Sequence, residues 1–389
     1  MHQLNILQKI LSPVMHNKRL NTFKEMISAS FSNSILSVTQ LGRTLGSNSE
    51  RTGIRKADRF LSNTKLHKEY PTICKELSKI IIGSTKCPWI LVDWTKVPNR
   101  DAHILRAAIV TIGRALTLYE EVHSESELGN SSVHKAFLKS LKKIIPINCT
   151  PIIITDAGFM IPWFKDILKL GWNYVGRVRG NKYYTGINNI PLKCKDIIAT
   201  ATPKYIGRVN LTQKHMFQTN MYVVKQSSKG RHTFNLSGNI KKCSHSKKHS
   251  ISAKESWCLV TSCTHSPFMP KKIVKIYQSR MQVEEGIRDL KSSKYGFGFE
   301  HMRSYKLQRI LILLLIAMIA SFIAWLTGYC AEKRNLHYKF QANSIKNKRV
   351  LSLFFLGIRI IKKSFIQLSL LDFKQAILAI RCKFKENFI

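Results

Sequence analysis

An uninterrupted apolar run, Ile310 to Thr327, restricts what this chain can fold into. A charge-free run of about 18 residues is at the lower limit for a membrane-spanning helix, and otherwise it forms the central helix of a large core. The flanking basic residues are Arg303, Lys306, Arg309, Lys333 and Arg334. They lie on both sides, so no charge asymmetry would orient an insertion. We expect a buried core helix and no membrane, with a basic single-span membrane protein as the weakest alternative.

The composition is that of a globular protein with a large positive charge. Hydrophobic residues make up 44% and charged residues 22%, which excludes a disordered chain, a disulfide miniprotein and a fibrous repeat. The 389 residues predict two or three domains at roughly 150 residues each. With 63 Lys and Arg against 22 Asp and Glu, the net charge is +41. Such an excess favours a nucleic-acid partner, although a general basic bias would give the same number.

The cysteines indicate free thiols. There are nine, an odd number, and no Cys-x-x-Cys pair occurs. This usage is typical of a reducing cytoplasm, and the N-terminal residues lack the pattern of a signal peptide. A mixed group of thiols and imidazoles could suggest zinc: Cys243, His245, His249, Cys258, Cys263 and His265. Their irregular spacing argues against a zinc site.

Residues 1 to 86 are expected to form a helical domain. Within it, a short helix capped by Thr39 and ending near Gly46, followed by a second helix from about Arg51 to Leu61, resembles a helix-turn-helix. The second helix carries four basic residues that would contact DNA: Arg51, Arg55, Lys56 and Arg59. An ordinary pair of helices remains the alternative.

Residues 87–180 are expected to form the first part of an α/β core. Apolar strands are predicted at 88–94, 150–156 and 172–180, and a hairpin at 103–112 and 115–122, with helices at 131–145 and 160–171. The order β-β-β-α-β-α-β predicts a mixed sheet of five strands covered by helices. His103, beside the hairpin, is expected to be structural.

The rest of the chain is divided by composition. Residues 181–256 form a predicted β-rich insertion, basic and mixed with aromatic residues, which is typical of a surface for nucleic acid. Residues 257–328 would complete the core with a catalytic helix and the apolar run, and 329–389 would form a helical C-terminal region. Arg177 and Arg179, at the entry to the insertion, are candidate DNA-phosphate contacts with a solvated strand as the alternative.

Two aspartates stand out by position. Asp93 interrupts the apolar strand ILVDW, where an ion is costly to bury without a partner or a metal. Asp156 ends the apolar strand PIIITD, and functional groups gather at strand ends in α/β sheets. Taken singly, each could equally be a turn or capping residue.

A third acid comes with polar companions. Tyr277, Arg280, Glu284 and Lys291 are spaced by three, four and seven residues, which places them within about 60° on one helix face. A solvated face with paired charges is the common alternative. Three carboxylates from two strands and a helix would suit two Mg²⁺ ions in phosphoryl transfer, and the basic residues would hold phosphate oxygens.

These residues resemble a known family. The pattern Tyr-x2-Arg-x3-Glu-x6-Lys resembles the signature of the insertion-sequence-four family of DDE transposases, and the chain is most similar to its insertion-sequence-ten members. The shared stretches include RLNTF, LHKE, ILVDW, TLYEE, DAGF, GW, RVRG, SAKE, SRMQVEE, RDLKS, FQAN and RVLS. The similarity runs from the first residues to about 365.

The resemblance implies a ribonuclease-H-like fold, the binding of DNA ends by residues 1 to 86, and a set of residue roles. Asp93, Asp156 and Glu284 match the catalytic, metal-binding acids of that family. The other signature positions, Tyr277, Arg280 and Lys291, would contact phosphates at the DNA end. The insertion would help to form a DNA hairpin, for which Trp257 and Met281 are the candidate base-flipping residues, with a plain core role as the alternative for Trp257.

The implied activity is cut-and-paste transposition. A dimer in the cytoplasm would pair the inverted ends of its element, cut them with Mg²⁺ (or Mn²⁺) through a hairpin, and join the 3′-hydroxyl ends to target DNA. The alternatives are a ribonuclease-H-like endonuclease or resolvase that cuts without joining, and an inactive DNA-binding relic.

Overall fold

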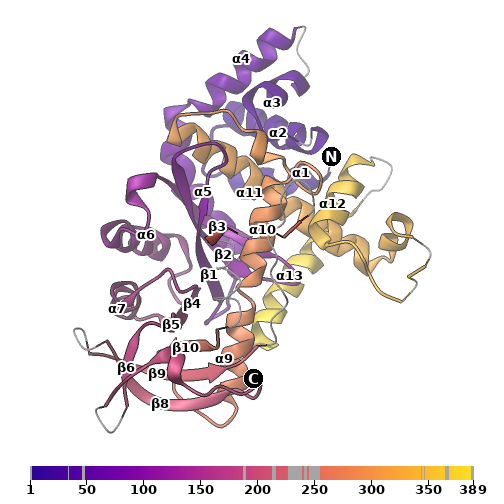
Figure 1. Ribbon diagram of the computed structural model, residues 1–389. Helices are drawn as coiled ribbons and strands as arrows, with labels where there is room; N and C mark the ends of the chain where they lie inside the picture. Colours follow the sequence, from indigo (N-terminus) through magenta and orange to yellow (C-terminus); the bar gives the residue numbers. More distant parts are fainter. Residues whose placement is uncertain are drawn as a thin grey trace. The chain divides into compact units, whose positions relative to one another are not determined.

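The computed structural model describes residues 2–33, 35–45, 49–186, 190–212, 216–226, 239–240, 243–244, 255–342, 344–345, 347–363 and 368–386. The chain divides into two compact units. Unit 1 comprises Met1–Pro151 and Met281–Ile389, and unit 2 comprises Ile152–Arg280. Each unit is described by itself below, with the element labels of Figure 1.

Unit 1 begins with five helices, as the periodicity of residues 1 to 85 predicts. Their bounds are α1 His2–Leu11, α2 Asn17–Ser32, α3 Val38–Thr44, α4 Glu50–Leu61 and α5 Thr64–Ile82. Side chains cap several of them. The Ser49 hydroxyl accepts from the backbone N–H of Thr52 at the start of α4, and the Asn63 side chain accepts from the N–H groups of Lys65 and Leu66 at the start of α5.

The predicted pair α3 and α4 forms, and the two helices lie side by side (Figure 1). The cap of α3 is Ser37, whose hydroxyl accepts from the N–H of Gln40, so the prediction of Thr39 was wrong by two residues. The helices meet at Gly42, where a Cβ would overlap the backbone of Ile54. This close approach requires glycine.

The strands of unit 1 form an antiparallel sheet in the order β3-β2-β1. Their bounds are β1 Trp89–Lys96, β2 Ala102–Val110 and β3 Ala115–Ser124. The predicted hairpin is therefore confirmed. The middle strand β2 is buried along its whole length, because helices cover both faces of the sheet. On one side α5 and α6 (Ser131–Ile144) contact β3.

The apolar run is the core of unit 1. It lies in α11, Leu307–Lys333, which packs against β3, α2 and α12 (Leu353–Lys362). By length and composition alone this helix could cross a membrane, but 89% of its apolar window is buried inside the protein. The prediction of a buried core helix is confirmed. The helix α13, Leu370–Glu386, also contacts α11.

Unit 2 is built on a mixed sheet in the order β4-β5-β10-β9-β8-β6-β7. Among the described strands of this unit, β4 and β5 pair in parallel, and the other pairs are antiparallel. The strand bounds are β4 Ile152–Thr155, β5 Asn173–Val178, β6 Tyr183–Thr185, β7 Pro191–Lys193, β8 Lys204–Leu211, β9 Phe217–Val224 and β10 Trp257–Thr261. The described residues of the unit also include the helices α7 Ile161–Lys169 and α9 Met269–Gln278.

The chain order of the first elements matches the prediction. Three strands precede α6, and β4, α7 and β5 follow, which is the predicted β-β-β-α-β-α-β. The region expected to be a β-rich insertion carries β6 to β9 among its described residues. The fold is thus mixed α/β, with helical segments at both ends of the chain.

Candidate active site

Asp93 lies on β1 at the point where its buried stretch ends. Residues 89–92 are buried, and Asp93 is half-buried. One carboxylate oxygen accepts the N–H of Trp94 at 2.9 Å. Directly opposite on β2 is Arg106, which pairs with Glu120 of β3 at 2.6 Å in a buried ion pair. Cross-strand partners share a face, so Asp93 lies on the same face as this pair.

Glu284 lies on α10, Met281–Lys291, which contacts β1 and β3. The last residue of the helix, Lys291, donates from its ammonium to the hydroxyl of Thr95 at 2.8 Å. Thr95 is two residues beyond Asp93, hence on the same face of β1. Glu284 precedes Lys291 by two helical turns, so it projects from the side of α10 that faces this strand.

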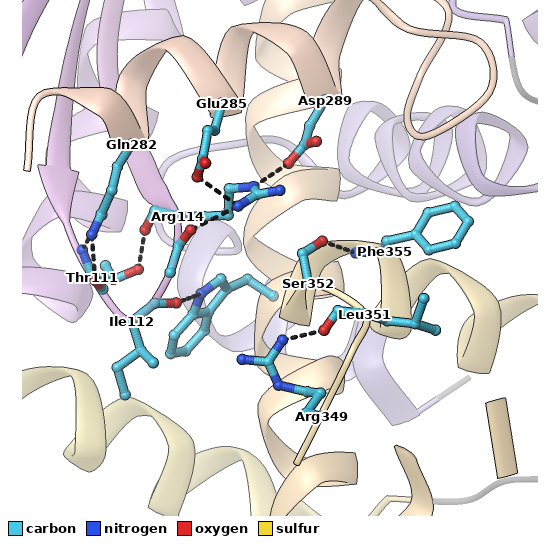
Figure 2. A network of polar contacts seen from close by, with 12 residues as sticks. Thr111, Ile112, Arg114, Gln282, Glu285, Asp289, Arg349, Leu351, Ser352 and Phe355 are labelled. Atoms are coloured by element: carbon cyan, nitrogen blue, oxygen red, sulfur yellow. Dashed lines mark hydrogen bonds and ion pairs between the residues drawn. The ribbon is translucent and has the colours of Figure 1, made fainter. Parts of the chain in front are cut away.

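Three groups of contacts hold α10 in place, and Figure 2 shows the first two of them. At its start, the amide of Gln282 forms two hydrogen bonds with the backbone of Thr111, at 3.1 and 3.2 Å. In the middle, Arg114 of the β2–β3 turn pairs with Glu285 at 2.7 Å and with Asp289 at 2.6 Å. With Lys291 at the end, the helix is fixed along its length, and Glu284 with it.

Lys291 is a cation in a partly buried place. Burial lowers its pKa, and the positive charge of Arg106 lowers it further. A partly buried ammonium with a lowered pKa is stabilised in its charged form by a nearby anion.

Asp156, in unit 2, directly follows β4, as predicted. One carboxylate oxygen accepts the N–H of Gly158 at 2.8 Å. A Cβ on Gly158 would lie 3.0 Å from that oxygen, so the tight turn favours glycine. The turn orients the carboxylate at the strand end.

Tyr277 of α9 is central to a polar group in unit 2. Its ring is only 4% exposed and meets Trp257 of β10 edge-on, with centroids 4.9 Å apart. Burial raises the pKa of Tyr277; the charges of Arg280 and Arg177 lower it, and that of Asp156 raises it. These charged residues therefore gather around the buried phenol.

The prediction that Tyr277, Arg280, Glu284 and Lys291 share one helix was wrong. The segment is two helices, since α9 ends at Gln278 and α10 begins at Met281. The cause is local: the hydroxyl of Ser279 donates to the carbonyl of Ile276 at 2.6 Å, and its N–H bonds the same carbonyl in a tightened last turn. Tyr277 and Arg280 thus belong to unit 2, and Glu284 and Lys291 to unit 1.

Other predicted DNA contacts differ in accessibility. Arg177 is mostly buried and lies 3.8 Å from Glu255, whereas Arg179 is exposed. Met281 is 42% exposed, as a residue that enters DNA would have to be. On α4, the basic residues Arg51, Arg55, Lys56 and Arg59 are all exposed.

Within the part of the chain that the structure describes, no group of three or more His, Cys, Asp or Glu side chains lies together as a metal site would. Cys258 is buried and Cys243 exposed, and the ring of His265 stacks on Tyr205. His245 and His249 lie outside the described residues. His103 is buried and meets the Trp94 ring at its edge, which is a structural role.

Two residues of the site escaped sequence reasoning, Arg114 and Gln282. Their partners are far away in sequence, so spacing alone does not connect them. One signal was available: Glu285 and Asp289 are one helical turn apart, and two acids on one helix face require a cation nearby. Arg114, beside the turn glycine of the hairpin, provides it.

A known protein family matches more than half of the chain. Residues 89–323 match the transposase DDE domain family, and this is more than half of the 389 residues, so the chain belongs to that family. The matched range contains Asp93, Asp156 and Glu284. No curated protein matches the chain. The protein is a transposase, a polynucleotidyl-transferase-type enzyme of DNA transposition and recombination, and its family generally uses divalent metal ions.

Proposed function

We propose that this protein is a cut-and-paste transposase of the insertion-sequence-four family, most similar to its insertion-sequence-ten members, with a ribonuclease-H-like core. Asp93, Asp156 and Glu284 are its catalytic acids. The observation that supports this most is the clamp on α10, which holds Glu284 on the side that faces the Asp93 strand. A helix fixed at three points is what a precisely placed ligand requires.

The three acids fit a divalent metal by their chemistry. Each offers carboxylate oxygens, the donors that Mg²⁺ and Mn²⁺ prefer. Asp93 and Asp156 each use one oxygen on a neighbouring backbone N–H, which fixes the direction of the carboxylate. A pair of such ions would activate the attacking oxygen and stabilise the leaving oxygen of an in-line displacement.

The reaction proceeds by successive displacements at phosphorus. A water oxygen attacks the phosphodiester at the element end and frees a 3′-hydroxyl. This hydroxyl attacks the opposite strand and forms a hairpin, which a second water opens. The resulting 3′-hydroxyls attack target DNA. One site serves every step because each is the same displacement with a different nucleophile.

The basic and aromatic residues take the supporting roles. Arg280 and Lys291 bind non-bridging phosphate oxygens, while the buried phenol of Tyr277 holds Arg280. Trp257 and Met281 receive the displaced base of the hairpin. The exposed basic residues of α4 and Arg179 bind the DNA backbone, and two protein copies pair the element ends in the cytoplasm.

The test uses the DNA that flanks the gene, where the inverted ends lie. Purified wild type is incubated with this DNA and Mg²⁺, beside Glu284→Gln and a matched control, Asp166→Asn. Asp166 is an acid of α7 whose only ion pair among the described residues is with Lys169. Products are resolved on a denaturing gel, which separates nicks, hairpins and joined molecules.

We expect hairpins and joined products from wild type and Asp166→Asn, and none from Glu284→Gln. Cleavage without joining would instead favour an endonuclease or resolvase. DNA binding without cleavage by any variant would leave an inactive relic and overturn the proposed activity.

A further inference from the structure

The basic residues before the apolar run line a cavity that the proposed active site does not use. In unit 1 a cavity of about 350 Å³ opens where the chain enters α11, and it also touches the start of α3 and one side of α4. Its charged lining residues are Arg303, Lys306, Arg309 and Asp58, and Tyr305 is its aromatic one.

The cavity carries an excess of positive charge. Arg309 pairs with Asp58, so these two charges offset each other. Arg303 and Lys306 are exposed and have no ion pair among the described residues. The Nε of Arg309 is buried and lacks a hydrogen-bond partner. A buried donor without an acceptor is unfavourable, so the guanidinium of Arg309 is incompletely satisfied beside the cavity.

The backbone adds to this preference. The helix α11 begins at Leu307, and its N-cap Lys306 gives it no capping side chain. The first N–H groups of a helix have no acceptor within it, and the helix dipole places partial positive charge there. The start of α11 and the cations Arg303 and Lys306 therefore favour a negatively charged group at the same place.

The segment is rigid before any ligand arrives. Arg100 donates to the carbonyls of Ser304 at 3.0 Å and Arg303 at 2.8 Å. Its guanidinium also lies 3.8 Å from the ring centroid of Tyr305. Tyr305 remains 79% exposed, with its phenol available as a donor. A pre-organised site loses little entropy on binding.

We propose that this cavity binds a backbone phosphate of double-stranded DNA, held by Arg303, Lys306 and the N-terminus of α11. A polymer is favoured over a free phosphate because Asp58, in the cavity wall, belongs to α4, whose exposed Arg55 and Arg59 extend the basic surface. The inference rests on the proposed function, since it gives the transposase a DNA contact apart from the acids.

The experiment measures DNA affinity against salt concentration for the full chain. Arg303→Ala combined with Lys306→Ala is compared with wild type and with a matched control, Lys135→Ala combined with Lys139→Ala, which removes two exposed charges from α6. Losing two phosphate contacts reduces the salt slope by about 2, whereas the control changes it little. Melting curves of all variants establish that they fold.

The outcomes separate the two proposals. A salt slope of DNA binding that is reduced only in the Arg303→Ala and Lys306→Ala variant supports the site. Weaker DNA binding by Tyr305→Phe supports it as well, because that variant lacks only the phenol hydroxyl. Equal slopes for cavity variant and wild type overturn the cavity while leaving the transposase intact. Free phosphate that raises the melting temperature of wild type alone, with equal DNA slopes, shows an anion site that is not for DNA. No DNA binding by wild type overturns the proposed function itself.

Discussion

Replacing Arg114 by alanine is the sharpest test of how the catalytic helix is held. Arg114 is 15% exposed and pairs with two acids of α10 at 2.6 and 2.7 Å. Asp289 is only 8% exposed, and removal of one partner from a buried pair costs about 3 to 5 kcal/mol. Glu285 is 37% exposed, so its pair adds about 0.5 kcal/mol. We expect Arg114→Ala to lower the free energy of unfolding by about 4 kcal/mol at pH 7.

The loss has to depend on pH. Burial already raises the pKa of Asp289, and Arg114 opposes that rise. Without Arg114, the folded-state pKa rises further above the unfolded value. The contribution of Asp289 to the stability of the variant is then full below the unfolded-state pKa of Asp289. It is lost as pH rises through the folded-state pKa of that residue. The difference between wild type and variant is therefore small near pH 4 and grows toward pH 7.

Urea unfolding followed by tryptophan fluorescence, at several pH values, measures this difference. The cycle with Asp289→Asn isolates the pair, because Arg114→Ala should cost much less when Asp289 is already neutral. DNA cleavage should also need more Mg²⁺ in Arg114→Ala if the clamp positions Glu284. A loss below 1 kcal/mol, or one independent of pH, would refute the reasoning.

Three further predictions concern other parts of unit 1. Gly42→Ala forces a Cβ into the α4 backbone and should lower the free energy of unfolding by about 2 kcal/mol in urea titrations, whereas Gly186→Ala, in open space, should not. Trp325→Phe removes the hydrogen bond to the carbonyl of Ile112 at 3.3 Å and should cost about 1 to 3 kcal/mol by the same assay. For His123, burial lowers the pKa, but the hydrogen bond and charge of Glu121 outweigh it and raise it overall. The free energy of unfolding of wild type should thus exceed that of His123→Gln by its full amount below the unfolded-state pKa of His123. This difference should decrease as pH rises through the folded-state pKa of that residue.

The sequence predicts the strands and helices of this protein well because they are strongly patterned. The strand around Asp93 is a compact apolar run, so an acid within it is conspicuous, and the structure places Asp93 where the burial ends. Asp156 likewise follows the last buried residue of β4. Whether the three acids act together is a prediction that the proposed gel assay tests.

Two kinds of interaction could not be predicted from the sequence: a side-chain hydrogen bond that ends a helix, and contacts between residues far apart in the chain. Periodicity predicts one helix through residues 277 to 291. In the structure the first helix ends near Ser279, whose hydroxyl donates to the backbone carbonyl of Ile276. Arg114 meets its partners 171 and 175 residues later, which no local pattern reveals. The cavity at α11 combines three separate stretches of chain for the same reason.

The burial of α11 also has a consequence for synthesis of the protein. The strand β3 and the helix α2 pack against α11, which begins at Leu307. A ribosome therefore synthesises β3 and α2 long before α11. Until α11 is made, the apolar faces of β3 and α2 stay exposed. Exposed apolar surface of this kind favours aggregation of the nascent chain. Truncations that end before Lys333 should accumulate as insoluble protein, however intact their acids are.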